Sequence, residues 1–222
     1  MPGRVPGIGD SCWMYHAFSA ARASFMLGGM TPVAAPENPD VAVWRKAKRP
    51  ELIARRLALT AAERTAAGDR ITMRLKALLA AAPARLMGFY WPFRGEYDPR
   101  PLVRELHAAG AALALPVVIG KAQPLVFRPW WPGAPMARGV WDIPVPAAGD
   151  PVQPDTLLVP LVGFDAGNYR LGYGGGFYDR TIAAVAVRPR SIGVGFACAR
   201  LPTVHPQPYD VRMDHVVTDE DH

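Results

Sequence analysis

Residues 156–180, "TLLVPLVGFDAGNYRLGYGGGFYDR", carry the strongest structural signal in this chain. The apolar run 156–164 is typical of a buried strand, and a helix is predicted from about Gly176 to Val187. Between them, residues 170–180 hold four glycines, which let the backbone turn sharply or approach another group closely because they lack a Cβ. A strand, a glycine-rich turn and a helix together indicate an α/β domain, in which ligands bind outside the carboxyl ends of the strands.

Short apolar runs and amphipathic segments alternate on both sides of this stretch. A helix is expected to begin at Asn38 and Pro39, with Pro50 kinking or dividing it. "TAAE" (60–63) fits a capping box, which predicts a second helix to about residue 81. The remaining predicted elements are a helix from Asp98 to about Gly110 and strands at 86–90, 111–118, 124–127 and 191–196. This order predicts a three-layer α/β/α fold with a mainly parallel sheet and a ligand site at the carboxyl ends of its strands.

The chain is expected to form one α/β domain over residues 41–222, because its length and its half-apolar composition suit one sizeable core. Residues 1–40, rich in Gly and Pro, are interpreted as a partly irregular N-terminal extension. The proline-rich segment 129–154 is predicted to be a long ordered loop.

Composition narrows the class of protein. Lys and Arg number 25 against 19 Asp and Glu, so a net charge of +6 favours anionic partners such as nucleotides, phosphates or nucleic acid. No apolar run is long enough to span a membrane, and Cys12 and Cys198 do not make a disulfide framework. The expectation is a cytoplasmic protein, monomeric, with small-molecule partners and no membrane association. Nucleic acid is a less favoured partner, since no RNA- or DNA-binding signature is present.

The glycine tract has the properties of a phosphate site. A helix N-terminus presents unpaired N–H groups and the positive end of the helix dipole, and four glycines would let an anion reach them: Gly172, Gly174, Gly175 and Gly176. Arg170 could add a bidentate phosphate contact, and Asp179 could complement the dipole or hold Mg²⁺. Neither common nucleotide fingerprint is present, so a purely structural glycine turn stays open as the alternative.

The segment "VPLVGFDAGNYRLGYGGGFYDR" (159–180) closely resembles the signature of the 5-formyltetrahydrofolate cyclo-ligases, also called methenyltetrahydrofolate synthetases. The resemblance covers roughly residues 44–219. Its other parts are "RKAKRPELIARRLALTAAER" (45–64), "GVWDIPVP" (139–146) and "YDVRMDHVVTD" (209–219). Residues 1–40 are not covered by it.

The resemblance implies an enzyme that uses ATP as co-substrate together with Mg²⁺. It implies that Arg45 and Arg49 bind the ATP phosphates, with Lys46 as an alternative because the family usually has lysine at the position of Arg45. The other implied ATP contacts are Arg170, Gly172, Gly174, Gly175, Gly176 and Tyr178, of which Arg170 and Tyr178 are also the implied catalytic residues. Asp179 and Asp210 match the family's magnesium-binding acids. Arg55 and Arg56 are expected to be surface residues.

The folate side of the implied site is aromatic. Trp91 and Glu96 match positions that contact the folate, and the tract from Tyr173 to Phe177 would form the wall between the two substrates. Trp141 is expected to close over the folate. The alternatives are that the aromatic side chains belong to the core and that Glu96 is solvated. Phe177 stands where a tyrosine is commoner, which removes a hydroxyl.

The implied reaction converts 5-formyltetrahydrofolate to 5,10-methenyltetrahydrofolate, with release of ADP and phosphate, through phosphorylation of the formyl oxygen. Such chemistry requires alignment and charge neutralisation rather than a catalytic His, Cys or Ser. Two alternatives remain: a divergent ATP-dependent paralogue with another folate or heterocycle as acceptor, and a non-enzymatic basic protein that binds nucleic acid.

Overall fold

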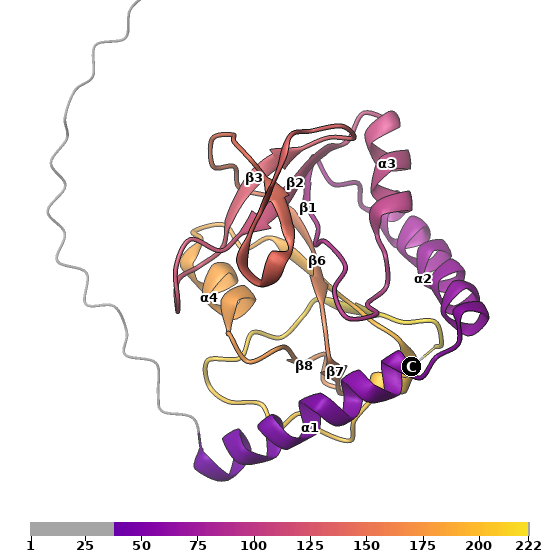
Figure 1. Cartoon of the computed structure of the whole chain (residues 1–222), viewed down its shortest axis with the longest axis vertical. Helices are drawn as coiled ribbons and strands as arrows, with labels where there is room; N and C mark the ends of the chain where they lie inside the picture. The colour runs from indigo at the N-terminus through magenta and orange to yellow at the C-terminus, as the bar shows by residue number, and fades with distance from the viewer. Residues whose placement is uncertain (1–37, 222) are drawn as a thin grey trace, which may run out of the picture. The chain divides into compact units, whose positions relative to one another are not determined.

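A computed structural model describes residues 38–221, which belong to one compact unit. Its centre is a six-stranded sheet in the order β10-β9-β6-β1-β2-β3 (Figure 1). The strands are β1 (Leu86–Gly88), β2 (Ala112–Val117), β3 (Val126–Trp130), β6 (Thr156–Pro160), β9 (Arg190–Val194) and β10 (His215–Val217). Neighbouring strands are parallel except for the antiparallel pair β2–β3. The mainly parallel sheet predicted from the sequence is therefore confirmed.

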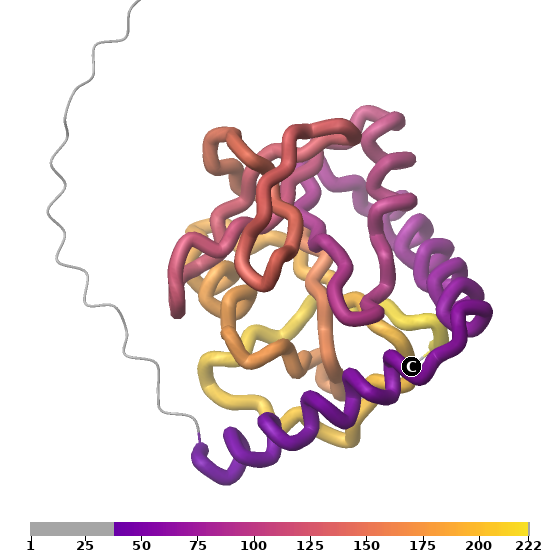
Figure 2. The backbone as a smooth tube through the Cα atoms, viewed as in Figure 1, coloured from indigo at the N-terminus to yellow at the C-terminus, as the bar shows by residue number. Residues whose placement is uncertain are grey.

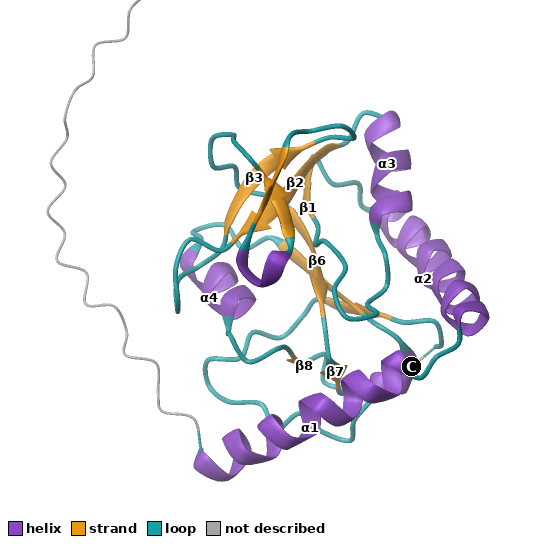
Figure 3. Ribbon diagram, viewed as in Figure 1, coloured by secondary structure: helices purple, strands orange, loops and turns teal. Residues whose placement is uncertain are grey.

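Helices cover both faces of this sheet (Figure 3). Helices α2 (Ala61–Ala81) and α3 (Arg100–Ala108) pack on one face, where Leu158 of β6 points into the core. Helix α4 (Phe177–Ala184) packs on the other face with Leu157 and Val159. Successive side chains of a strand point to opposite faces, so the unbroken apolar run of β6 serves two cores. The three-layer α/β/α arrangement is confirmed.

Helix α1 (Pro39–Leu57) lies along the end of the unit where the glycine tract passes together with residues 209–219, called the closing segment below. Asn38 caps it by accepting a hydrogen bond from the Asp40 N–H, as predicted. The expected division at Pro50 does not occur, and one helix continues through it. Pro50 removes the donor for the Lys46 carbonyl, and both residues lie on the exposed side of the helix, where such a loss costs less than in the core. The capping box of α2, between Thr60 and Glu63, is present as predicted.

Two stretches differ from the sequence-based expectation. The predicted strand 156–164 is divided into β6 and β7 (Gly163–Phe164), because Pro160 lacks the N–H with which a strand would continue its ladder. Strand β7 pairs antiparallel with β8 (Arg170–Leu171), so the glycine tract follows β8 and not β6 directly.

The segment 129–154 is not a loop throughout, so that prediction was wrong. It contains the antiparallel pair β4 (Met136–Arg138) and β5 (Pro144–Pro146), joined by a 3₁₀ turn at Val140–Asp142. Each strand of a two-stranded ribbon is an edge strand, and an edge tolerates the prolines that suggested a loop.

Figure 2 shows the closing segment, in yellow, running beside the indigo α1 before the chain ends. This segment was matched only by resemblance, and its strand β10 was not predicted from the local pattern. The expected extension, residues 1–40, with Cys12, lies outside the described residues up to residue 37. No helix between residues 38 and 221 is long and apolar enough to cross a membrane.

Candidate active site

A cavity of about 360 Å³ opens where the parallel strands end. Tyr90 and Trp91 reach it from the chain beyond β1, Val118 from the end of β2, and Pro160 from the end of β6. This is the edge of the sheet at which the sequence predicted a ligand site. The predicted site residues that line the cavity are Trp91, Glu96, Trp141, Arg170, Gly172, Tyr173, Gly175, Gly176, Phe177, Tyr178 and Asp179.

The glycine tract forms one wall of the cavity and carries unpaired backbone donors. Within residues 38–221, the N–H groups from Gly172 to Gly176 donate no hydrogen bond to another group of the protein. Gly176 then caps α4 with φ +61° and no side-chain hydrogen bond, so the first-turn N–H groups of that helix also have no partner in the part of the chain that the structure describes. A row of unsatisfied donors at a helix N-terminus is a site for an anion such as phosphate.

Arg49 lies against this tract although it does not line the cavity. Its Nε donates to the Gly172 carbonyl at 2.8 Å. Gly174 adopts φ +96°, and a Cβ built there would stand 3.2 Å from the Arg49 guanidinium carbon. The tract thus requires glycine at this position both for its backbone angle and for the close approach of the arginine.

Arg170 and Asp179 neutralise each other in the cavity wall. Nη2 of Arg170 lies 2.9 Å from Oδ2 of Asp179, and the side chains are 5% and 18% exposed. Both residues also hold Val211, whose N–H donates to Asp179 at 3.0 Å and whose carbonyl accepts from Arg170 at 3.2 Å. Arg170, expected to bind phosphate, and Asp179, expected to bind the metal, therefore form one ion pair that is hydrogen-bonded to Val211 of the closing segment.

Arg45 and Asp210 form a second ion pair away from the cavity lining. Arg45 is 5% exposed and also donates to the carbonyls of Val204 and His205. The Asp210 carboxylate accepts from the Gln207 N–H as well. The structure does not place this pair with the residues of the cavity. Lys46, the alternative phosphate ligand, is exposed on α1 and is likewise outside the lining.

Glu96 lies at the base of the cavity, only 7% exposed. Its Oε1 accepts from the Tyr173 hydroxyl at 2.8 Å, and Oε2 accepts from the Phe93 N–H at 2.9 Å. Burial raises the pKa of Glu96 to about 7, against the lowering effects of the Arg56 charge, the Phe93 N–H and the Tyr173 hydroxyl. The same burial raises the pKa of Tyr173 and of Tyr178, which keeps both phenols protonated. Glu96 is thus a buried hydrogen-bond acceptor whose carboxyl group exchanges its proton near neutral pH.

Arg56 supports this acceptor, and the expectation that it is a surface residue was wrong. It is 4% exposed, with Nη1 at 4.0 Å from Oε1 of Glu96 and Nη2 donating to the Tyr173 hydroxyl at 2.7 Å. Nη1 donates to the Leu161 carbonyl, and Nε donates to the Arg94 carbonyl. The signal that could have found it is helical spacing, since positions 45, 49, 52 and 56 recur on one face of α1. Arg55, one position earlier, is exposed as expected.

Aromatic rings form the remaining walls. Trp141 meets Phe177 edge-to-face with 6.4 Å between the ring centroids, and Phe93 lies 5.9 Å from Tyr173. Trp141 is 58% exposed and holds φ +57° at the tip of the β4–β5 hairpin. Trp91 both lines the cavity and packs against the core, with the Arg100 guanidinium 4.9 Å from its ring. Such walls suit a flat, conjugated ligand.

The residues of this cavity fit ATP. They also fit Mg²⁺, provided that the phosphates of the nucleotide supply most of its ligands. No group of three possible metal ligands from His, Cys, Asp and Glu occurs in the described part of the chain. Asp179 nevertheless stands in the cavity wall beside the tract, and its carboxylate has acceptor capacity beyond its two protein partners. Mg²⁺ commonly uses one or two protein carboxylates and takes its other ligands from phosphates and water.

Comparison with known proteins gives the family. The sequence model of the 5-formyltetrahydrofolate cyclo-ligase family matches residues 41–219. The chain belongs to that family. The 5-formyltetrahydrofolate cyclo-ligase of Escherichia coli (strain K12) is 30% identical over 171 residues, which are 74% of this chain and 94% of the relative. That of Mycoplasma pneumoniae is 26% identical over 178 residues, 79% of this chain and 99% of the relative.

Solved structures of cyclo-ligase relatives share the fold. The 5,10-methenyltetrahydrofolate synthetase of Aquifex aeolicus superimposes with a TM-score of 0.69 at 27% identity, over 80% of this chain and 90% of that one. The synthetase of Mycoplasma pneumoniae gives a TM-score of 0.67 at 24% identity, over 79% and 99%. The predicted membership of this enzyme family is confirmed.

Proposed function

We propose that this protein is an ATP-dependent 5-formyltetrahydrofolate cyclo-ligase, which forms 5,10-methenyltetrahydrofolate, ADP and phosphate. The observation that carries the proposal is that the glycine tract, whose N–H groups have no partner among residues 38–221, forms one wall of an aromatic cavity with a buried acceptor. Tyr173 belongs to both, because it lies within the glycine tract and donates to Glu96. An anionic substrate and a flat one would therefore lie next to each other.

The chemical obstacle in this reaction is the low reactivity of the formamide group of 5-formyltetrahydrofolate. Its carbonyl carbon is a poor electrophile because nitrogen donates into it, and its oxygen is a poor leaving group. Transfer of the γ-phosphate of ATP to the formyl oxygen removes both obstacles. N10 then attacks the carbon, the C–O bond breaks, phosphate leaves with the oxygen, and the N10 proton is released.

For the protein, this chemistry is mainly a matter of alignment and charge. The N–H groups from Gly172 to Gly176 would hold the phosphates, with Arg49 at their back and Arg170 at their side. Tyr178 is partly buried and lines the cavity beside Arg170. Desolvation raises the pKa of its phenol, so the protonated hydroxyl could donate a hydrogen bond to the transferred group. Lys46 could reach the outer phosphates from α1.

Mg²⁺, when bound, would neutralise charge on the phosphates, and Asp179 is the acid that we assign to it. Asp210 would have to leave its ion pair with Arg45 before it could reach a metal. We therefore assign Arg45 and Asp210 to holding the closing segment on α1, which fixes Val211 and through it Arg170 and Asp179.

The folate would occupy the aromatic side of the cavity. Glu96 would accept hydrogen bonds from the pterin N–H and amino groups, and the rings of Trp91, Trp141 and Phe177 would lie around it. Phe177, which meets Trp141 edge-to-face, has no hydroxyl with which to form a hydrogen bond to the folate.

The test is a direct assay. The purified protein is incubated with ATP, Mg²⁺ and 5-formyltetrahydrofolate, and the absorbance of methenyltetrahydrofolate is followed, with ATP omitted as the control. We expect product to form only with ATP and in equal amount to ADP. Stoichiometric ATP binding without product would contradict the proposed acceptor and favour a paralogue with another one. Binding of nucleic acid that weakens steeply with salt, without ATP binding, would contradict the enzyme altogether.

A further inference from the structure

Four charged side chains line the cavity, and Arg94 differs from the other three. Arg170 and Asp179 form an ion pair, and Glu96 faces Arg56. Arg94 is exposed and has no carboxylate within 4.0 Å among residues 38–221. Its guanidinium lies over the Phe93 ring, with 5.0 Å between the guanidinium carbon and the ring centroid. As far as the described residues go, Arg94 is therefore the cavity-lining charge without an opposite charge beside it, and it lies at the mouth of the cavity.

The turn that presents Arg94 is held rigidly. Arg94 and Gly95 have φ +46° and +73°, and the turn is closed by a hydrogen bond of 3.1 Å from the Glu96 N–H to the Phe93 carbonyl. A positive φ at a non-glycine residue such as Arg94 is a strained conformation that surrounding contacts must hold. Those contacts are the donations from Arg56 to the Arg94 carbonyl, at 3.1 Å, and from Arg64 to the Gly95 carbonyl, at 2.9 Å.

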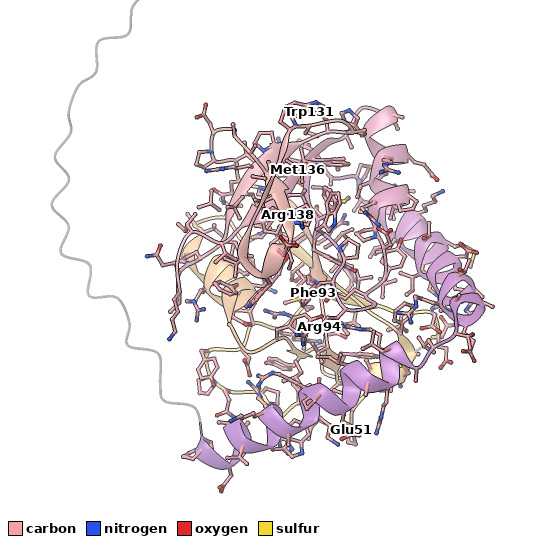
Figure 4. The ribbon with its side chains drawn as sticks, viewed as in Figure 1. Glu51, Phe93, Arg94, Trp131, Met136 and Arg138 are labelled. Atoms are coloured by element: carbon pink, nitrogen blue, oxygen red, sulfur yellow. The ribbon has the colours of Figure 1, made fainter. Side chains whose placement is uncertain are left out.

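The same turn carries two side chains of opposite charge at two depths. Glu96 is buried at the base of the cavity and Arg94 is exposed at its mouth. Figure 4 shows Phe93 and Arg94 between the β4–β5 hairpin, marked by Arg138, and helix α1, marked by Glu51. A ligand that fits both side chains has hydrogen-bond donors at its inner end and an anionic group where it emerges.

We infer that Arg94 binds a carboxylate on the outer, acidic tail of the ligand and so determines specificity for tail-bearing substrates. The inference rests on the proposed function, for which that tail is the glutamate of the folate. Arg94 is a binding residue and has no part in the chemical step. A nucleotide phosphate is the other anion that could reach the exposed guanidinium of Arg94. The glycine tract and Arg49 already form the proposed phosphate site. Arg94 lies instead on the same turn as Glu96, the proposed folate acceptor, so we assign it to the folate.

The test compares 5-formyltetrahydrofolate with 5-formyltetrahydropteroate, which lacks the glutamate, by calorimetric titration of the intact protein. The variants are Arg94→Gln, Arg94→Lys and, as control, Arg104→Gln, which removes the same charge from an exposed arginine outside the cavity. For Arg94→Gln we expect the folate to bind about threefold to tenfold more weakly, because the variant loses a partly exposed, charge-assisted hydrogen bond. Binding of the pteroate should not change. Arg94→Lys should restore part of the loss, and salt should weaken folate binding to the wild type more than to Arg94→Gln.

Three results would overturn the inference: an equal loss for both compounds, a loss of ATP affinity, or no loss beyond that of Arg104→Gln. The first would make the turn merely structural, and the second would assign Arg94 to the nucleotide. Because binding is measured without turnover, the subsite and the reaction can fail separately. A wild-type protein that binds the folate through Arg94 but forms no methenyltetrahydrofolate contradicts the proposed reaction alone. A wild-type protein that binds neither compound contradicts both.

Discussion

Glu96 is a buried carboxyl group whose protonation should affect the stability of the folded chain. Its pKa rises from 4.5 to about 7 on folding, mainly through burial. The folded state therefore holds the proton more tightly than the unfolded chain, so the free energy of unfolding falls as pH rises from about 4.5 to 7 and levels off above it. A shift of this size corresponds to roughly 3 kcal/mol.

The Glu96→Gln variant keeps an acceptor for Tyr173 but cannot ionise. Between pH 5 and pH 8, urea unfolding should show the difference in unfolding free energy moving in favour of the variant by up to roughly 3 kcal/mol. The same pH dependence in both proteins would show that Glu96 titrates normally. Removal of the charge should also weaken folate binding at pH 8, where the wild-type carboxylate is ionised.

Substitution of Gly174 tests the proposed phosphate site, because a side chain at this position would occupy the space of the anion. In Gly174→Val the side chain would press on Arg49 and fill space that an anion needs, so we expect ATP binding to be lost in a folded protein. Gly110→Val is the matched control, since Gly110 has the same φ of +96° and no atom within 4 Å of its built Cβ. Both variants carry the backbone strain, and calorimetric titration with ATP separates it from the loss of the site. Normal ATP affinity in folded Gly174→Val would refute the assignment.

At the scale of elements, α1 is attached to the rest of the unit by two buried arginines and one partly buried arginine, which donate to backbone carbonyls. Arg45, Arg49 and Arg56 all do so, and Leu52 lies between them in an apolar cluster. A buried arginine is stabilising only while its nitrogens are paired, and its removal leaves the carbonyls without donors. The packing of α1 on the unit thus depends on the hydrogen bonds of these three arginines as well as on the apolar contacts of Leu52.

The Arg56→Met variant measures this attachment. It leaves the carbonyls of Leu161 and Arg94 and the Tyr173 hydroxyl without their donor, and we expect a loss of about 3 to 5 kcal/mol in the free energy of unfolding. Arg55→Met is the control, because Arg55 is exposed and its partner Glu51 is partly exposed; we expect a change within about 0.5 kcal/mol. Similar losses in the two variants, measured by urea unfolding, would mean that the buried arginine does not hold the helix.

At the scale of the whole molecule, the cavity joins parts of the chain that are far apart in sequence. The chain after β1, the β4–β5 hairpin and the glycine tract all contribute to its lining. A ligand that binds this assembled site stabilises the folded state against unfolding of the whole unit.

For ATP at about 100 times its dissociation constant, the expected stabilisation is about 2.7 kcal/mol, which for a chain of this length raises Tm by roughly 5 to 10 °C. Calorimetric melting with and without nucleotide measures it. The shift should disappear in Gly174→Val and persist in Gly110→Val. An equal shift in all three proteins would place the nucleotide elsewhere.

Most elements of the fold could be predicted from local patterns. The capping box at Thr60 and Glu63, Asn38 before Pro39 and the apolar run of β6 all act within a few residues, so the sequence reveals them directly. The β4–β5 ribbon was missed because prolines that break a central strand are tolerated in an edge strand. Strand β10 was missed because three residues have too short a pattern to be recognised without their neighbour β9.

The sequence by itself determined the α/β class, the position of the glycine tract before a helix and the family to which the chain belongs. Only the tertiary structure decided which charges meet. It joined Arg170 with Asp179 and Arg45 with Asp210, buried Arg56 beneath Glu96, and left Arg94 at the mouth of the cavity without a carboxylate among the described residues. Helix and strand patterns depend on neighbours within a few positions, whereas burial and ion pairing depend on how whole segments fold against one another, including segments as far apart in sequence as those of Arg45 and Asp210. Local residue order does not encode those contacts, so the roles of the charged side chains could be assigned only once the chain was folded.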